Sequence, residues 1–249
     1  MEIFLVVIFG LVIGSFLNVC ICRIANEESI IFPPSHCINC GYELKAKDLI
    51  PILSYIFLGG KCRSCKEKIS IQYPIVEVLN AILYISIYLK FGFTLNLFKF
   101  CLLASLLIVI GIIDLKTKSV YNSNIVFGVI SGLIFVGLEW LETGVIPWNY
   151  ITGAFIGFIV IYLIVILTRG MGEGDIDIAL ICGLFLGLKG ILVTLFISVV
   201  LGGLVATVIL ILKLKDKKAE IAFGPYLAIG GLIACLYGSN IIDFYLKLF

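Results

Sequence analysis

Long apolar segments limit most strongly what this chain can fold into. Hydrophobic residues make up 61% of its 249 residues, above the roughly 45–50% that is usual for soluble domains. Several runs approach or exceed the ~18 apolar residues typical of a transmembrane helix. The pattern predicts an all-α polytopic membrane protein with about eight transmembrane helices, at residues 2–22, 74–90, 97–113, 121–138, 150–168, 175–188, 190–212 and 222–247.

Two of these segments differ from an ordinary span. The first carries Glu2 where a cleaved signal peptide has basic residues, and it lacks a small-residue cleavage site, so we expect a retained helix. The sixth reaches only ~20 Å at about 1.5 Å per residue, less than the ~30 Å hydrocarbon core. We expect its beginning near Asp175 to lie recessed in the membrane, where irregular backbone must line protein or a wet cavity.

The distribution of lysine and arginine predicts the orientation. If the N-terminus lies outside, fourteen of the 18 basic residues fall on the inner side and four on the outer side. Cytoplasmic loops of membrane proteins carry such an excess. We therefore expect a plasma or inner membrane protein whose cytoplasmic segments are 24–73, 114–120, 169–174 and 213–221.

The segment 24–73 departs from membrane composition and holds a C-x2-C-x21-C-x2-C pattern, formed by Cys37, Cys40, Cys62 and Cys65. Four thiolates can close a tetrahedral structural zinc site, and such a site can stabilise a small insert that lacks its own core. Two disulfides or four idle thiols are the alternatives. A reducing cytoplasm disfavours the disulfides, so we predict zinc.

Two acidic residues stand at the ends of apolar segments. Asp114 closes the third span in "LIVIGIIDLKTKSVYN", and Asp175 begins the sixth in "RGMGEGDIDI". Two crossings separate them, so both are expected at the same membrane face. An ionisable residue at the rim of a span indicates a functional site, although a helix dipole alone would also stabilise Asp175.

Two carboxylates within reach of one water can perform aspartic proteolysis. Because like charges so close cannot both ionise, one stays protonated while the other acts as base toward the water. Gly172 and Gly174 have no side chains that would keep an extended peptide away from the acids. We therefore predict Asp114 and Asp175 as the catalytic residues, and we do not expect Asp177 to be one.

Five motifs, in order, give the chain a resemblance to the type IV prepilin peptidases, the membrane aspartic proteases of the GxGD class. They are "GSFLNVCICR" (14–23), the cysteine-bearing insert with the segment after it (36–81), "IIDLKTKSVYN" (112–122), "GMGEGDIDIALICGLFLG" (170–187) and "FGPYLAIGG" (223–231). A lone G-x-G-D would be a weak signal, but these motifs cover most of the chain.

The resemblance implies an endopeptidase that removes the short basic leader of prepilins or pseudopilins at the cytoplasmic face. Many members then methylate the new N-terminus, so we expect S-adenosylmethionine as methyl donor beside structural zinc, although no familiar nucleotide loop locates its site. The expected partners are these substrates and the lipid bilayer, with no nucleic acid. The chain divides into a first transmembrane helix (1–23), a cytoplasmic zinc-binding insert (24–73) and a membrane aspartic protease core (74–249).

Some positions leave questions open. Tyr121 stands where the family usually has proline, and Asp177 stands where it usually has lysine. Asp177 puts the pH dependence in question but not the reaction. Glu77 and Asn18 match polar family positions and could serve methylation, substrate binding or interhelical hydrogen bonds.

Two other functions remain as alternatives. A GxGD intramembrane protease without methyltransferase activity, such as a presenilin, would also use an acid pair. Those enzymes have tyrosine where this chain has Ile113, and they carry a Pro-Ala-Leu motif that is absent here. An ion-coupled transporter would suit intramembrane acids and a broken helix, but both acids lie near one face.

Overall fold

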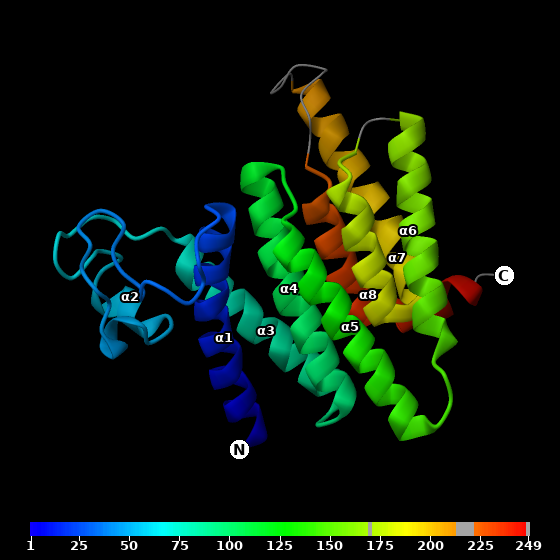
Figure 1. The fold of residues 1–249 in the computed structure, drawn as a ribbon, viewed down its shortest axis with the longest axis horizontal. Coiled ribbons are helices and arrows are strands. Elements are labelled where there is room, and N and C mark those ends of the chain that lie inside the picture. Colours follow the sequence, from blue (N-terminus) through cyan, green and yellow to red (C-terminus); the bar gives the residue numbers. More distant parts are fainter. Residues whose placement is uncertain (169–170, 213–221, 248–249) are drawn as a thin grey trace. The chain divides into compact units, whose positions relative to one another are not determined.

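Helices make up nearly all of the regular structure (Figure 1). A computed structural model describes residues 1–168, 171–212 and 222–247, so the expected cytoplasmic loop 213–221 and the start of the loop 169–174 lie outside the described residues. Within this part, seven helices are long and apolar enough to cross a membrane. They are α1 (Glu2–Ala25), α3 (Gln72–Phe91), α4 (Leu95–Thr117), α5 (Asn122–Thr143), α6 (Trp148–Thr168), α7 (Gly174–Ile211) and α8 (Gly224–Leu246).

The predicted fold class is confirmed. The chain is a multi-pass membrane protein, the described residues form no β-strand, and a four-cysteine insert lies between the first two long helices. Eight expected spans correspond to seven helices because the segments 175–188 and 190–212 are both parts of α7. The expected and observed helices otherwise agree to within a few residues at their ends.

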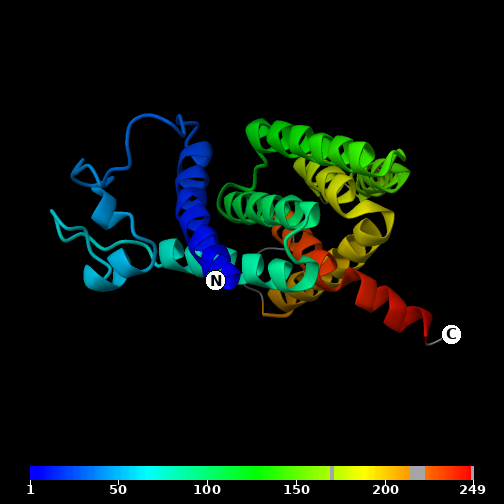
Figure 2. The same cartoon turned by 90° about the horizontal axis from the view of Figure 1, so that it is seen from below.

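The helix α7 doubles back on itself at Gly187, whose backbone is not helical (φ 71°, ψ −176°). A Cβ atom on Gly157 of α6 would lie 2.5 Å from the carbonyl oxygen of Ala179 and 3.0 Å from Cγ1 of Ile191. Along one straight helix these two residues would be about 18 Å apart. The helix therefore consists of two arms that meet at a bend, drawn in yellow in Figure 2, and glycine suits the bend because it adopts positive φ readily.

The chain forms two compact units, Met1–Val109 and Ile110–Phe249. In the first unit, α1 packs closely on α3. A Cβ atom on Gly10 or Gly14 would lie 2.7 Å from a Cα atom of α3, so the absence of a side chain lets the two backbones meet. Asn80 strengthens this contact, because its Nδ2 donates to the carbonyl oxygen of Gly10 at 2.8 Å.

In the second unit, α7 packs against α5, α6 and α8. Its first arm is enclosed: Ile178, Ile181 and Phe185 have no exposed surface. The second arm is joined to α8 by a hydrogen bond of 3.0 Å from Ser198 Oγ to the carbonyl oxygen of Tyr226. The arm that begins with the predicted catalytic aspartate is therefore held on three sides by helices of the same unit.

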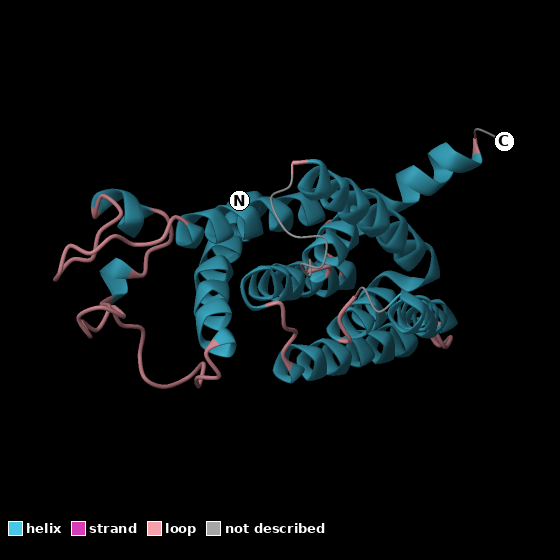
Figure 3. Ribbon diagram, turned by 90° about the horizontal axis from the view of Figure 1, so that it is seen from above, coloured by secondary structure: helices cyan, strands magenta, loops and turns pink. Residues whose placement is uncertain are grey.

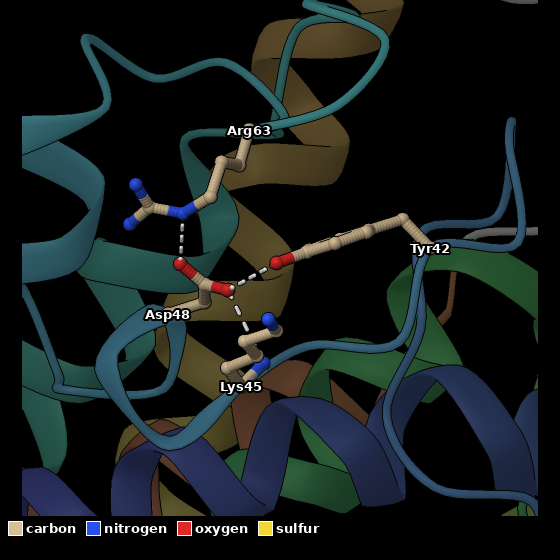
Figure 4. A network of polar contacts seen from close by, with 4 residues as sticks. All are labelled: Tyr42, Lys45, Asp48 and Arg63. Carbon is tan, nitrogen blue, oxygen red and sulfur yellow. Dashed lines mark hydrogen bonds and ion pairs between the residues drawn. The ribbon is translucent and has the colours of Figure 1, made fainter.

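The insert between α1 and α3 contains only a short 3-10 helix, η1 (Ala46–Asp48), and the five-residue helix α2 (Leu53–Phe57), and the rest is loop and turn (Figure 3). Its polar centre is Asp48, whose carboxylate accepts Arg63 Nε at 2.7 Å, the Lys45 N–H at 3.1 Å and the Tyr42 hydroxyl at 3.3 Å (Figure 4). Burial acts to raise the pKa of Asp48, but these donors and the charge of Arg63 hold it below its ordinary value. The ionised carboxylate thus ties three loop segments together.

Candidate active site and metal centre

Asp114 lies in the last turn of α4, and only 5% of its surface is exposed. The helix ends soon after it, because Lys118 takes a left-handed conformation (φ 53°) and donates its N–H to the Asp114 carbonyl oxygen at 2.8 Å. In the part of the chain that the structure describes, the side-chain oxygen Oδ2 has no hydrogen-bond partner. Burial of an unpaired carboxyl oxygen costs free energy, so its presence here indicates a functional site.

Asp175 lies in the first turn of α7, and 4% of its surface is exposed. Its Oδ2 accepts the N–H of Gly172 at 3.0 Å, and its own N–H donates to the Gly172 carbonyl oxygen at 3.1 Å. This reciprocal pair closes a tight turn and sets the direction of the carboxylate. The helix N-terminus also favours negative charge there.

The first turn of α8 connects the surroundings of the two acids. A Cβ atom on Gly224 would lie 2.6 Å from Asp114 Oδ2 and 3.0 Å from Cδ1 of Ile178, which is about one turn beyond Asp175. Both carboxylates are buried there. The second unit therefore brings both predicted residues to one place, where the end of α4 meets the beginnings of α7 and α8.

Sequence reasoning assigned no role to Gly224. It is the first residue of α8, and Pro225 follows it in the first turn, a position that suits proline. The neighbouring residues in the sequence do not show that this first turn of α8 packs on the carboxylate of Asp114, which lies much earlier in the chain. The contact is a product of tertiary packing, and a side chain at this position would require the Asp114 carboxylate to move.

Asp177 is turned away from this place. It is half-buried, and the charge that acts on it is that of Glu173. Two residues along a helix correspond to a rotation of about 200°, so Asp175 and Asp177 point in nearly opposite directions. The geometry favours the expectation that Asp177 is not part of the acid pair.

We predict that Asp177→Asn and Asp177→Lys each keep cleavage within several-fold of the wild type. The acid limb of the pH–rate profile should move by less than about half a unit, because solvent and distance weaken the charge. Initial rates on a prepilin substrate across a pH series would measure this. Complete loss of activity in a well-folded Asp177→Asn protein would show that a third carboxylate takes part.

Tyr121 occupies the N-cap of α5 with an extended backbone (φ −88°, ψ 136°). Its carbonyl oxygen accepts the N–H of Asn124 at 3.0 Å, so the helix begins normally without a proline. The departure from the family pattern at this position therefore leaves the start of α5 intact.

The four cysteines of the insert converge on one point. The Sγ atoms of Cys37 and Cys65 are 3.8 Å apart, those of Cys40 and Cys62 are 4.0 Å apart, and all four lie within 4.8 Å of one another. A tetrahedral thiolate site with bonds of about 2.3 Å separates its sulfurs by about 3.8 Å. The set fits one metal ion.

Each cysteine pair forms the same turn. The N–H of Gly41 donates to the Cys37 carbonyl oxygen at 2.8 Å, and the N–H of Lys66 donates to that of Cys62 at 3.1 Å. Gly41 and Lys66 both take left-handed conformations, with φ of 70° and 61°. Two equivalent knuckles thus present their sulfurs to a common centre, as the spacing of the motif predicted.

Asn18 and Glu77 make contacts within the first unit. Asn18 Nδ2 donates across to the Tyr73 carbonyl oxygen of α3 at 3.1 Å, which is the interhelical bonding that the sequence left as one option. Glu77 Oε2 accepts the N–H of Ile52 at 2.8 Å. Ile52 has φ 61°, a costly conformation for a β-branched residue, so Glu77 holds a strained turn of the insert against α3. A role for either residue in methylation stays open.

The fold and the site define a class: a multi-pass helical membrane protein with two buried carboxylates in one unit and, in the other, four cysteines that could hold a metal ion. The model of the bacterial peptidase A24 N-terminal domain matches residues 8–91, and the model of the type IV leader peptidase family matches residues 101–207. This chain belongs to the type IV leader peptidase family.

Relatives over nearly the whole length carry the name prepilin leader peptidase/N-methyltransferase. The one from Bacillus subtilis is 36% identical over 97% of this chain and 96% of its own. Those from Xanthomonas campestris pv. campestris and Pseudomonas aeruginosa are 32% and 30% identical, over 96% and 97% of this chain and 92% of their own. No solved structure is significantly similar to the chain. The resemblance seen in the motifs is confirmed, as is the expectation of a peptidase.

Proposed function

We propose that this chain removes the basic leader of prepilins or pseudopilins at the cytoplasmic face of the plasma or inner membrane and then methylates the new N-terminus. The observation that carries the peptidase part is the pair of buried carboxylates, Asp114 and Asp175, that lie around the first turn of α8. Membership of the family, and the name that its relatives carry, support both activities.

The pair supports hydrolysis by a water held between two carboxyl groups. The ionised carboxylate takes a proton from the water, whose oxygen attacks the peptide carbonyl carbon, while the protonated carboxyl gives its proton to the carbonyl oxygen. When the resulting diol collapses, the C–N bond breaks, the nitrogen takes the proton from the protonated carboxyl, and one diol hydroxyl returns a proton to the pair. The products are a leader with a new carboxyl group and a mature chain with a new amine, and the acid pair is restored with one proton.

Several features support the proposed membrane face. Fourteen of the 18 basic residues lie on one side of the expected topology, and cytoplasmic loops carry this excess. Asp114 stands at the end of α4 and Asp175 at the beginning of α7, so two intervening helices, α5 and α6, return the chain to the same side. Substrates whose leaders lie in the cytoplasm would meet the pair there.

We propose zinc for the four-cysteine set, because four thiolates with sulfurs 3.8–4.0 Å apart in opposite pairs match its preferred geometry. Cys37, Cys40, Cys62 and Cys65 would hold it and join the two knuckles. S-adenosylmethionine, when bound, would supply the methyl group for the new amine. We retain the division into a first helix (1–23), a zinc-binding insert (24–73) and a membrane aspartic protease core (74–249) as part of this proposal.

A cleavage assay tests the proposal. Detergent-purified protein is incubated with a prepilin peptide that includes the leader and the start of the apolar stem, with and without S-adenosylmethionine, and the products are weighed by mass spectrometry. We expect a cut directly before the stem and, with the donor, a mature fragment heavier by one CH2 group. Cleavage without the mass gain would support the peptidase without methylation, and no cleavage of any prepilin would contradict the proposal.

A further inference from the structure

The two glycines before Asp175 have different surroundings. A Cβ atom on Gly174 would lie 2.6 Å from both Cβ and Cγ2 of Val120, closer than real Cβ atoms approach any atom. Among the described residues, a Cβ atom on the exposed Gly172 would meet Asp175 Oδ2 alone, at 3.8 Å, which is an ordinary contact. Of these two glycines, Gly174 is therefore the one that close packing within the described part of the chain requires.

The contact joins the two segments that carry the acids. Val120 lies in the short connection between α4, which ends at Thr117 soon after Asp114, and α5. Gly174 is the first residue of α7 and precedes Asp175 directly. The Val120 side chain therefore packs the segment that follows Asp114 against the backbone that precedes Asp175.

We propose that Val120 is a positioning residue of the active site. Position 174 must be glycine because the Val120 side chain packs on it, and this contact sets the distance between Asp114 and Asp175. This inference rests on the proposed two-carboxylate hydrolysis. It differs from the expectation that both glycines serve to admit the substrate backbone. In that case both would matter for substrate binding, whereas a packing contact makes Gly174 matter for the rate of the chemical step.

The test is a set of variants at both sides of the contact. Gly174→Ala should lower kcat by about 100-fold at nearly unchanged KM, because a shift of about 1 Å between catalytic groups has this effect. Val120→Gly introduces no clash, so it tests the contact even if Gly174→Ala folds poorly, and it should lower kcat several-fold.

The double variant Gly174→Ala/Val120→Gly decides between the explanations. With glycine at position 120, the nearest atom of the described residues to the new Cβ is the Cα of residue 120, at 3.7 Å, an ordinary contact. The double variant should therefore recover to the level of Val120→Gly alone. Gly172→Ala should lose less than Gly174→Ala. Gly137→Ala, where the added Cβ meets no atom of the described residues within 4 Å, controls for the substitution itself.

Three results would overturn the inference: a double variant no more active than Gly174→Ala, full kcat in Val120→Gly, or a Gly172→Ala loss as large as that of Gly174→Ala with a raised KM. The last result would restore substrate access as the reason for both glycines. Melting temperatures of all variants separate loss of folding from loss of rate. If Asp114→Asn or Asp175→Asn keeps cleavage, the proposed hydrolysis itself fails, whatever the rescue shows.

Discussion

Asp114→Asn and Asp175→Asn should each lower prepilin cleavage by about 10³-fold or more, because the remaining carboxylate cannot serve as both base and acid toward the water. Both proteins should still insert into the membrane, since an amide has nearly the size of a carboxylate. Cleavage of a prepilin peptide by purified protein, read by mass spectrometry, measures the effect.

The acid pair offers its own controls. Asp177→Asn removes a carboxylate from the same turn of α7 without touching the pair, and Asp243→Asn does so in the far part of α8. Both should keep cleavage within several-fold of the wild type. Asp114→Asn with more than a tenth of wild-type cleavage would remove Asp114 from the mechanism, and the same holds for Asp175.

Purified protein should contain one zinc ion per chain, and a variant with serine at Cys37, Cys40, Cys62 and Cys65 should contain none. The insert has only two short helices, so its fold depends on the knuckles and on the Asp48 network. We expect this variant to lose methylation first and to keep measurable cleavage, because Asp114 and Asp175 lie in the other unit. Elemental analysis and the two product masses measure these effects.

Cys235→Ala is the matched control for the zinc experiment, because Cys235 is a buried cysteine of α8 outside the cluster. It should leave the zinc content unchanged. Full zinc in the quadruple serine variant would place the metal elsewhere. Loss of cleavage before methylation would contradict the assignment of the insert to the second activity.

The order of apolar runs was enough to predict the helices and the insert. Each membrane helix satisfies its own backbone hydrogen bonds, so length and hydropathy locate it without knowledge of its neighbours. The cysteine knuckles are equally local: a C-x2-C turn with Gly41 or Lys66 in a left-handed conformation requires only a few adjacent residues. The sequence indicated a break between the apolar runs 175–188 and 190–212, close to the bend at Gly187, but it did not indicate the direction of the bend.

Contacts between distant segments could not be read in this way. Gly174 and Gly224 are motif glycines in the sequence, but one receives Val120 and the other faces Asp114. The sequence predicted only that the two acids share a membrane face. A count of helix crossings gives the face on which a residue lies, but it does not give the distance between two residues. The first turn of α8, which lies against both Asp114 and Ile178 of α7, is what brings the surroundings of the two carboxylates together. Local patterns therefore determine which helices form and which residues stand at their ends, while close backbone packing at glycines determines which of those ends meet.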